Sequence, residues 1–491
     1  MAEDFESRFE PRISAAVRQR AVSYAEEIKA ANPQLALDRE LEPLLPQDLT
    51  SGRSLHLDDY SSIPLGQKSD HVRFMQQRAC LRATDNDIVA LLDHVPPDYI
   101  DYFHASTGMS LSWLTPKGDS IPTGLAQACW LDRNVRRQLR HEIRHEGLRF
   151  IHPHISNVAV WELADLLRRS TRYEVFVVGP PPGVAELAND KVAFARIVHD
   201  LLGERYIPRT ESACNLGRLS QLVHDLMPAS RYIGIKVPNS VGGRGNMVVD
   251  TRNLHGLTLA QIRLRLKGML SALAVPSHSR LLVDVWESHV SLAGSTQLWI
   301  PPLATGEPRI EGVFEQLIAN QVGHFQGCQP VGLPLEIETE TVDASYTIAL
   351  LLQHLGYIGR CSFDFILVGD SVGSGHLEFI ECNGRWGGTS APMTLTNHLF
   401  GSYLKKPFLS RVFAMPNHPL TFADVRRELH DILYNYATNV GWALLYNPDR
   451  LQHREINAIV WGNSLAEVDV RKRELEARLA ACHPAIRSTT V

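Results

Sequence analysis

The spacing of hydrophobic positions changes repeatedly along the chain, and it predicts alternating helices and strands. Continuous apolar and β-branched runs at 86–92, 173–178 and 281–285 are typical of buried strands. Apolar residues recur every three or four positions at 192–202 and 465–481, which predicts amphipathic helices. We therefore expect a mixed α/β or α+β protein.

Composition limits the number of domains and the kind of partner. With 491 residues the chain is long for a single core, so we expect roughly two to four domains. A net charge of −5 argues against a general nucleic-acid binder. The acidic start has no apolar signal segment, no long apolar run suggests a membrane span, and the 7 cysteines include no C-x-x-C pair. These features predict a reduced, cytoplasmic protein.

Two apolar runs, 361–368 and 376–382, flank a loop of glycine, serine and aspartate. This pattern predicts a β-hairpin with a longer connection. If Val368 pairs with Leu377 across the loop, the antiparallel register places one acid of each strand on the same face, with Cβ atoms roughly 5 Å apart.

These two acids are Asp364 and Glu381, and both lie among hydrophobic residues, where an unpaired charge is costly to bury. A divalent cation such as Mg²⁺ between the carboxylates would remove their repulsion. Asn383 would add an oxygen on the face of Glu381, because alternate residues of a strand share a face, whereas Glu378 would face the other side. The alternative is a solvated sheet face without a metal.

A second metal-binding pattern is present at 141–145, where the sequence H-E-x-x-H matches the zinc-protease motif. The surrounding helix is rich in arginine, and these cations would oppose the binding of zinc. Arg144 also occupies a position that zinc-protease helices normally keep uncharged. We therefore favour a solvated helix face over a protease site.

A glycine-rich loop follows the predicted strand 232–238 and ends at Asn246. Glycines let successive backbone N–H groups turn toward an anion, and Lys236 would place a positive charge beside it. The loop glycines are Gly242, Gly243 and Gly245. A plain turn is the alternative, because the loop does not match the Walker A sequence.

Lys191 opens the predicted helix 192–202, directly after the N-cap candidates Asn189 and Asp190. A lysine in the first turn opposes the helix dipole unless an anion lies nearby. Lys191 is therefore a candidate anion ligand, with a solvated side chain as the alternative.

The segment 379–388 resembles the metal-binding signature of the ATP-grasp superfamily. That signature is an E-x-N-x-R sequence, met here by Glu381, Asn383 and Arg385, and it follows an upstream acid such as Asp364. Three further motifs occur in the order expected for this superfamily, between residues 180 and 395.

Lys236 with its glycine-rich loop resembles the phosphate-covering loop, Lys191 resembles the first nucleotide-contacting lysine, and 283–286 resembles the adenine-binding linker. Within the superfamily the chain is most similar to carboxylate-amine ligases of peptide natural-product assembly, the pheganomycin-type peptide ligases.

The resemblance implies an ATP-grasp fold, in which two α+β lobes clasp ATP, over residues 179–400. Residues 1–178 would form an N-terminal arm and a pre-ATP-grasp α/β domain. Residues 401–491 would form a small α+β subdomain that we interpret as a lid or as the surface of a homodimer.

The resemblance also assigns nucleotide-binding roles. Lys191 and Lys236 would hold the α- and β-phosphates of ATP, and the backbone of 242–246 would cover the γ-phosphate. The adenine linker would include Asp284, Trp286 and Glu287.

The remaining implied roles concern metal and substrate. Asp364, Glu381 and Asn383 would bind two Mg²⁺ ions, or Mn²⁺ in their place. Arg385, whose planar guanidinium suits oxyanions, would pair with the substrate carboxylate or the transferring phosphoryl group.

The implied reaction joins the carboxylate of an amino acid or small peptide to an amine. The carboxylate would attack the γ-phosphate to give an acyl phosphate and ADP, and the amine would then displace phosphate. Lys236 and Arg385 would be the catalytic residues, since positioning and charge neutralisation do most of the work in phosphoryl transfer. A phosphotransferase on the same fold is the alternative, because these motifs indicate ATP and metal but not the acceptor, and a noncatalytic binding protein is the third option.

Overall fold

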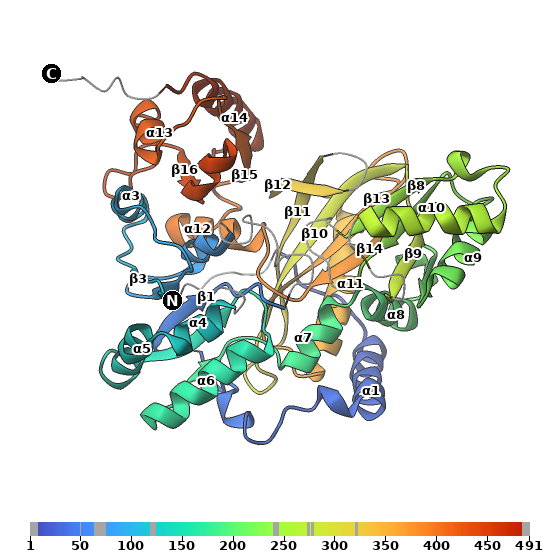
Figure 1. The fold of residues 1–491 in the computed structure, drawn as a ribbon, viewed down its shortest axis with the longest axis horizontal. Coiled ribbons are helices and arrows are strands. Elements are labelled where there is room, and N and C mark those ends of the chain that lie inside the picture. The colour runs from blue at the N-terminus through green and yellow to red at the C-terminus, as the bar shows by residue number, and fades with distance from the viewer. Residues whose placement is uncertain are drawn as a thin grey trace.

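The computed structural model describes residues 8–49, 51–62, 75–117, 124–238, 245–272, 275, 279–319 and 323–483. Within these ranges the chain forms three β-sheets with helices packed against them (Figure 1). No helix of these ranges combines the length and the apolar character that crossing a bilayer requires.

The first sheet is parallel and has the strand order β3-β2-β1-β4-β5. Leu139, Ile151 and Trp161 are buried in the core between this sheet and its helices. Its strands are β1 (Arg53–Leu57), β2 (Ile88–Ala90), β3 (Ser112–Leu114), β4 (Leu148–Pro153) and β5 (Phe176–Val177). The helices are α3 (Pro97–Thr107), α4 (Leu125–Leu131), α5 (Arg133–His145) and α6 (Val158–Thr171).

The second sheet is small and antiparallel, with the order β6-β9-β7-β8. It lies at the right of Figure 1, and one of its faces packs against α9 and α10. Its strands are β6 (Thr210–Ala213), β7 (Tyr232–Lys236), β8 (Asn246–Asp250) and β9 (Leu281–Val285), and the two helices are α9 (Leu216–Leu226) and α10 (Leu259–Ala272).

The third sheet has eight strands in the order β14-β13-β10-β11-β12-β15-β17-β16. Its strands are β10 (Val290–Ile300), β11 (Arg309–Ala319), β12 (His324–Pro330), β13 (Gly359–Val368), β14 (His376–Asn383), β15 (Phe408–Ala414), β16 (Ala443–Tyr446) and β17 (Glu455–Trp461). The remaining helices are α1 (Ala15–Ala31), α7 (Pro182–Asn189), α8 (Lys191–Leu202), α11 (Leu335–His354), α12 (Ser390–Phe400), α13 (Phe422–Glu428) and α14 (Leu465–Ala480).

The C-terminal strands β15 to β17 continue this large sheet, because Gly327 of β12 pairs with Arg411 of β15. They also share a hydrophobic core with α3, whose Tyr102 hydroxyl accepts a hydrogen bond from the Leu445 N–H at 2.7 Å. Figure 1 accordingly shows α13 beside α3. The C-terminal segment therefore packs as one wall of the molecule, against both the sheet and the N-terminal part.

Several predicted elements differ in their bounds. The helix predicted at 422–436 ends at Glu428, because the chain turns back and the N–H groups of Trp442 and Ala443 both donate to the carbonyl of Ile432. The predicted turn at 179–183 already contains the start of α7 at Pro182, a residue suited to the first helical position. The Asp190 carboxylate caps α8 by accepting from the N–H groups of Val192 and Ala193, which confirms the predicted cap.

Candidate active site

A single cavity of about 760 Å³ brings together most of the residues singled out in the sequence. Strands of the two antiparallel sheets, the carboxyl end of the parallel sheet and the C-terminal strands all contribute to its wall. The predicted residues that line it are Lys191, Lys236, Asn246, Asp284, Trp286, Glu287, Asp364, Glu381, Asn383 and Arg385. Gly242 and Gly243 lie outside the described residues, and the Gly245 carbonyl accepts from the N–H of Val237 at 3.0 Å, which closes the base of that loop.

The two hairpin acids face each other as predicted, with Asp364 of β13 directly opposite Glu381 of β14. The Ser295 hydroxyl donates to Asp364 Oδ1 at 2.8 Å, and Asn383 Nδ2 donates to Asp364 Oδ2 at 2.8 Å. Burial and the charge of Glu381 raise the pKa of Asp364 to about 7. Burial acts on Glu381 in the same direction, but the charges of Lys191 and Arg385 hold its pKa below the ordinary value. One acid is therefore ionised beside another that holds its proton near neutral pH.

The register that produces this pairing contains a β-bulge between Asp364 and Phe365. The predicted pairing of Val368 with Leu377 is wrong by one residue, since Val368 pairs with His376. The bulge shifts the register by one residue between there and the acids, so Asp364 still pairs with Glu381 as predicted.

The bulge also corrects the prediction for Glu378. This residue pairs with Ile366, which shares a strand face with Asp364, so Glu378 lies on the cavity side of the hairpin and not on the opposite side. Burial raises the pKa of Glu378, and the charges of Glu287 and Asp284 add to the effect.

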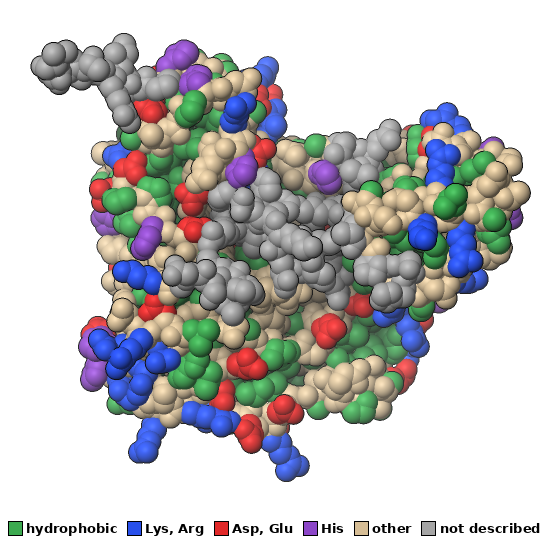
Figure 2. Space-filling view, viewed as in Figure 1, with side chains coloured by type: hydrophobic (Ala, Val, Ile, Leu, Met, Phe, Trp, Pro, Cys, Tyr) green, Lys and Arg blue, Asp and Glu red, His purple; other side chains and the backbone are tan. Residues whose placement is uncertain are grey.

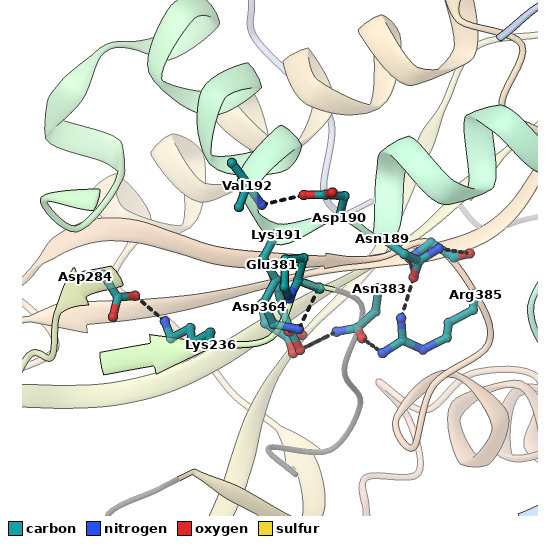
Figure 3. A network of polar contacts seen from close by, with 12 residues as sticks. Asn189, Asp190, Lys191, Val192, Lys236, Asp284, Asp364, Glu381, Asn383 and Arg385 are labelled. Atoms are coloured by element: carbon teal, nitrogen blue, oxygen red, sulfur yellow. Dashed lines mark hydrogen bonds and ion pairs between the residues drawn. The ribbon is translucent and has the colours of Figure 1, made fainter. Parts of the chain in front are cut away.

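Two lysines approach this hairpin from different elements (Figure 3). Lys191 begins α8, is 4% exposed, and places Nζ 2.7 Å from Glu381 Oε2. Lys236 ends β7, is 3% exposed, and forms a short ion pair with Asp284, while Nζ lies 5.2 Å from the ring centre of Trp286. A cation buried in this way depends on its partner, and the carboxylates hold both ammonium groups at the cavity.

Part of the segment predicted to bind adenine has its main chain hydrogen-bonded within the small antiparallel sheet. Asp284 pairs through its main chain inside β9, and its side chain holds Lys236. The Trp286 N–H donates to the carbonyl of Tyr232 at 2.9 Å. Glu287 lines the cavity, and burial raises the pKa of its carboxyl group.

Arg385 is held by two side-chain amides. Its Nη1 donates to Asn189 Oδ1 and its Nη2 donates to Asn383 Oδ1, both at short distances (Figure 3). Asn189 also accepts from the N–H of Gly384 at 3.1 Å and donates to the Ala185 carbonyl at 2.8 Å. The sequence suggested Asn189 only as a helix cap. At the end of α7 it also contacts the residues after β14 and positions Arg385, a role that no local sequence pattern indicates.

The cavity also includes residues that the sequence did not indicate. The imidazole of His154 follows β4, and its ring centre lies 4.4 Å from that of Tyr60. The His154 carbonyl accepts from the N–H of Trp386 at 3.0 Å. These side chains come from the N-terminal part of the chain and meet Arg385 only through the fold, which explains why their role was missed.

The H-E-x-x-H segment lies on α5, away from this cavity. The rings of His141 and His145 lie 4.9 Å apart and are tilted by 42° on an exposed surface, whereas Glu142 is buried and places Oε2 2.6 Å from Arg53 Nη1. In the described parts of the chain, no third His, Cys, Asp or Glu forms a metal-binding group with them. Lys and Arg side chains gather over this helix (Figure 2), and they include Arg133, Arg136, Arg137, Arg140 and Arg144.

No protein-family model matches the chain, and no curated protein matches its sequence. Solved structures do match its fold. A biotin carboxylase from Campylobacter jejuni, in complex with β-γ-ATP, aligns with a TM-score of 0.53 and 11% identity, over 87% of this chain and 92% of that chain. An N5-carboxyaminoimidazole synthetase from Staphylococcus aureus, complexed with ADP, aligns with a TM-score of 0.52 and 11% identity, over 89% and 99%.

A third match is the N5-carboxyaminoimidazole synthase of Aspergillus clavatus, also in complex with ADP. Its TM-score is 0.50 and its identity 13%, over 87% of this chain and 98% of that chain. At such identities a structural match reports the fold. These matches confirm the predicted fold class, and the chain has the ATP-grasp fold.

Proposed function

We propose that this chain is an ATP-dependent ligase that joins a carboxylate to an amine and releases ADP and phosphate. The observation that carries the proposal is the opposed pair Asp364 and Glu381, which shares one cavity with two buried lysines and Arg385. The cavity volume lies in the upper part of the usual range for ligand pockets, so a nucleotide and a second small molecule fit together. Nucleotide complexes of the structural neighbours support ATP as the first ligand.

Lys191 and Lys236 would contact the α- and β-phosphates. Both ammonium groups reach the cavity from buried stems, where their attraction to a phosphate is stronger than in water. Glycines 242, 243 and 245 with Asn246 would cover the γ-phosphate, and Trp286 and Glu287 would lie along the nucleoside.

Asp364, Glu381 and Asn383 fit the binding of Mg²⁺, or of Mn²⁺ in its place. The two carboxylates converge from adjacent strands, and oxygen ligands of this kind suit a hard cation. The Asn383 oxygen accepts from Arg385 and its amide nitrogen faces Asp364, so Asn383 would join the ligands by turning its amide. Burial and the charge of Glu381 favour the protonated form of Asp364, and a divalent ion would take the place of that proton. When bound, the metal neutralises the charge that develops on the phosphates during transfer.

The proposed reaction has two steps. A carboxylate oxygen of the first substrate bonds to the γ-phosphorus, the bond from that phosphorus to the β-bridging oxygen breaks, and ADP leaves. The amine nitrogen of the second substrate then bonds to the acyl carbon, the carbon–oxygen bond to phosphate breaks, and the nitrogen loses a proton to water. Arg385 would hold the reacting anion, since each of its terminal nitrogens keeps a second N–H beyond those given to Asn189 and Asn383.

We propose amino acids or small peptides as substrates, on the basis of the sequence resemblance to pheganomycin-type peptide ligases. Residues 1–178, as a pre-ATP-grasp domain, and residues 401–491 would supply the walls that select them. Both parts line the cavity, through residues such as Tyr60 and Tyr446.

A screen tests the proposal. The protein is incubated with ATP, Mg²⁺ and pools of amino acids and short peptides, and ADP, phosphate and products are measured together, the products by mass spectrometry. A ligase gives equal amounts of ADP, phosphate and amide, and hydroxylamine in place of the amine gives a hydroxamate. A phosphotransferase instead gives ADP and a phosphorylated product with no free phosphate, and that result would replace the ligase by the kinase alternative.

A further inference from the structure

One arginine at the N-terminal wall of the cavity is buried without a counter-ion. Arg78 lies in the 3₁₀ helix Gln77–Arg82, is 5% exposed, and lines the cavity. Its Nη2 donates to the Tyr60 hydroxyl at 3.2 Å, and its Nε has no hydrogen-bond partner. Within the described ranges, no carboxylate forms an ion pair with it.

The neighbouring charges compensate this cation only in part, although the charge of Asp58 favours its ionised form. Asp58 is the nearby acid, and it forms an ion pair with Arg82 in which both side chains are fully buried. Tyr60 stays neutral because burial raises its pKa. His154 is neutral as well, because burial, and then the charges of Arg78 and Arg385, hold its pKa well below the ordinary value. Among the described residues, one acid, Asp58, therefore faces two arginines, Arg78 and Arg82, and this group keeps one net positive charge that an anionic ligand would balance.

The same contacts place Arg78 close to the reaction centre. Tyr60 links Arg78 to His154, since its hydroxyl accepts from Arg78 and its ring packs on the His154 ring. The His154 carbonyl in turn accepts from the N–H of Trp386, the residue after Arg385. A molecule that reacts beside Arg385 can therefore reach Arg78 with another of its groups.

We propose that Arg78 binds an anionic group of a substrate, either a carboxylate or a phosphate. The substrate carries this anionic group in addition to the group that reacts beside Arg385. The proposal rests on the proposed ligase function. It restricts the substrates to acids that have a second, unreacting anionic group, or to amines that carry an anionic group. Arginine suits the task because its planar fork pairs with two oxygens of such a group.

The test combines Arg78→Met with anion titrations. The protein is first loaded with Mg²⁺ and a non-hydrolysable ATP analogue, so that the nucleotide phosphate sites are filled. Sodium succinate and sodium phosphate are then titrated separately at constant ionic strength, and the Tm is recorded. We expect succinate or phosphate to raise the Tm of the wild type, and Arg78→Met to weaken the apparent affinity about tenfold or more. A response to succinate alone indicates a carboxylate substrate, and a response to phosphate alone a phosphorylated one.

The Tm without anions separates a binding role from a structural one. Arg78→Met removes a buried charge together with its hydrogen bond to Tyr60 and its attraction to Asp58, so it should leave the Tm of the anion-free protein within about 2 °C. Arg450 provides the matched control, because it lines the same cavity but pairs with Glu455. Arg450→Met should lower the Tm and keep the anion response.

Three results would overturn the proposal: no anion stabilises the wild type, Arg78→Met binds anions as the wild type does, or Arg78→Met folds but its Tm falls as much as that of Arg450→Met. If Arg78→Met does not fold, Tyr60→Phe, which removes the hydroxyl that holds Arg78, is the second variant, and unchanged anion binding in it would overturn the proposal. Failure of the ATP analogue to bind at all would contradict the ligase function separately.

Discussion

The two ends of the cavity balance their buried charges in different ways. At the hairpin end, Lys191 pairs with Glu381 and Lys236 pairs with Asp284, so each of the two lysines has an acid of its own. At the N-terminal wall, Arg78 donates to the neutral hydroxyl of Tyr60 and forms no ion pair with the residues that the structure describes. Both ends are buried to a similar degree, so the difference lies in the charge and not in exposure.

This difference indicates what each end binds. A nucleotide arrives with its own divalent metal, so the hairpin end can be nearly neutral before binding and still form a charge-compensated complex. An organic acid or a phosphorylated substrate arrives without a cation, so the N-terminal wall must provide the positive charge. The experiments below alter one end at a time, in order of decreasing expected effect.

The largest effect is expected from the hairpin acids. Asp364→Asn and Glu381→Gln remove a ligand charge but little volume, so the fold should persist while Mg²⁺-dependent ADP formation falls about a thousandfold. Circular dichroism checks the fold and an ADP assay the turnover. Glu378→Gln, on the same face opposite Ile366, is the matched control and should lose less than about tenfold, because it is not one of the paired acids. Unchanged turnover in either acid variant would rule out the metal assignment.

A smaller effect is expected from Asn189, whose side-chain oxygen accepts from Arg385. Asn189→Ala should lower kcat about tenfold to a hundredfold while leaving the affinity for MgADP unchanged. Without Asn189, Arg385 would be misplaced and would no longer orient the reacting anion. Asn189→Asp keeps an acceptor oxygen and should restore part of the rate. Weaker MgADP binding with an unchanged kcat would show that Asn189 serves the nucleotide instead.

The pH dependence follows from Asp364. Its pKa is raised from 3.8 to about 7, so the folded protein holds this proton more tightly than the unfolded chain does. The resulting stability is fully present below the unfolded value and is lost as the pH rises through about 7. Mg²⁺ competes with the same proton, so its affinity should fall about tenfold per pH unit below pH 7. Titrations of Mg²⁺ at pH 6 and pH 8 check this, and Asp364→Asn should remove the dependence; equal affinities in the wild type would contradict it.

Almost no effect is expected from the exposed histidines of α5. Changing His141 and His145 together to Gln should leave ADP formation near the wild-type rate, because both side chains lie outside the cavity. Elemental analysis should find no stoichiometric zinc in the wild type. Tightly bound zinc that the double variant loses would revive the protease interpretation.

The hairpin end could be predicted from sequence because its chemistry is local. Asp364, Glu381 and Asn383 lie on two adjacent strands of one hairpin, and a period of two fixes which side chains share a face. The prediction failed at Glu378, since a bulge shifts the register by one residue and no residue pattern in the hairpin announces it.

The N-terminal wall could not be predicted in the same way. Tyr60, Arg78 and His154 come from three segments, and only the order of the parallel strands brings them together. The continuation of the large sheet by β15 was missed for a related reason, because pairing between Gly327 and Arg411 depends on tertiary packing and not on local propensity.

The transfer of ¹⁸O from a labelled substrate carboxylate tests the proposed chemistry most directly. Once the screen has identified a substrate pair, the acid is labelled in its carboxylate and the released phosphate is analysed by mass spectrometry. The acyl-phosphate route passes one carboxylate oxygen to phosphorus, so one ¹⁸O atom should appear in each phosphate released. Unlabelled phosphate, or a stable phosphorylated product with no free phosphate, would mean that the cavity binds ATP but does not activate a carboxylate.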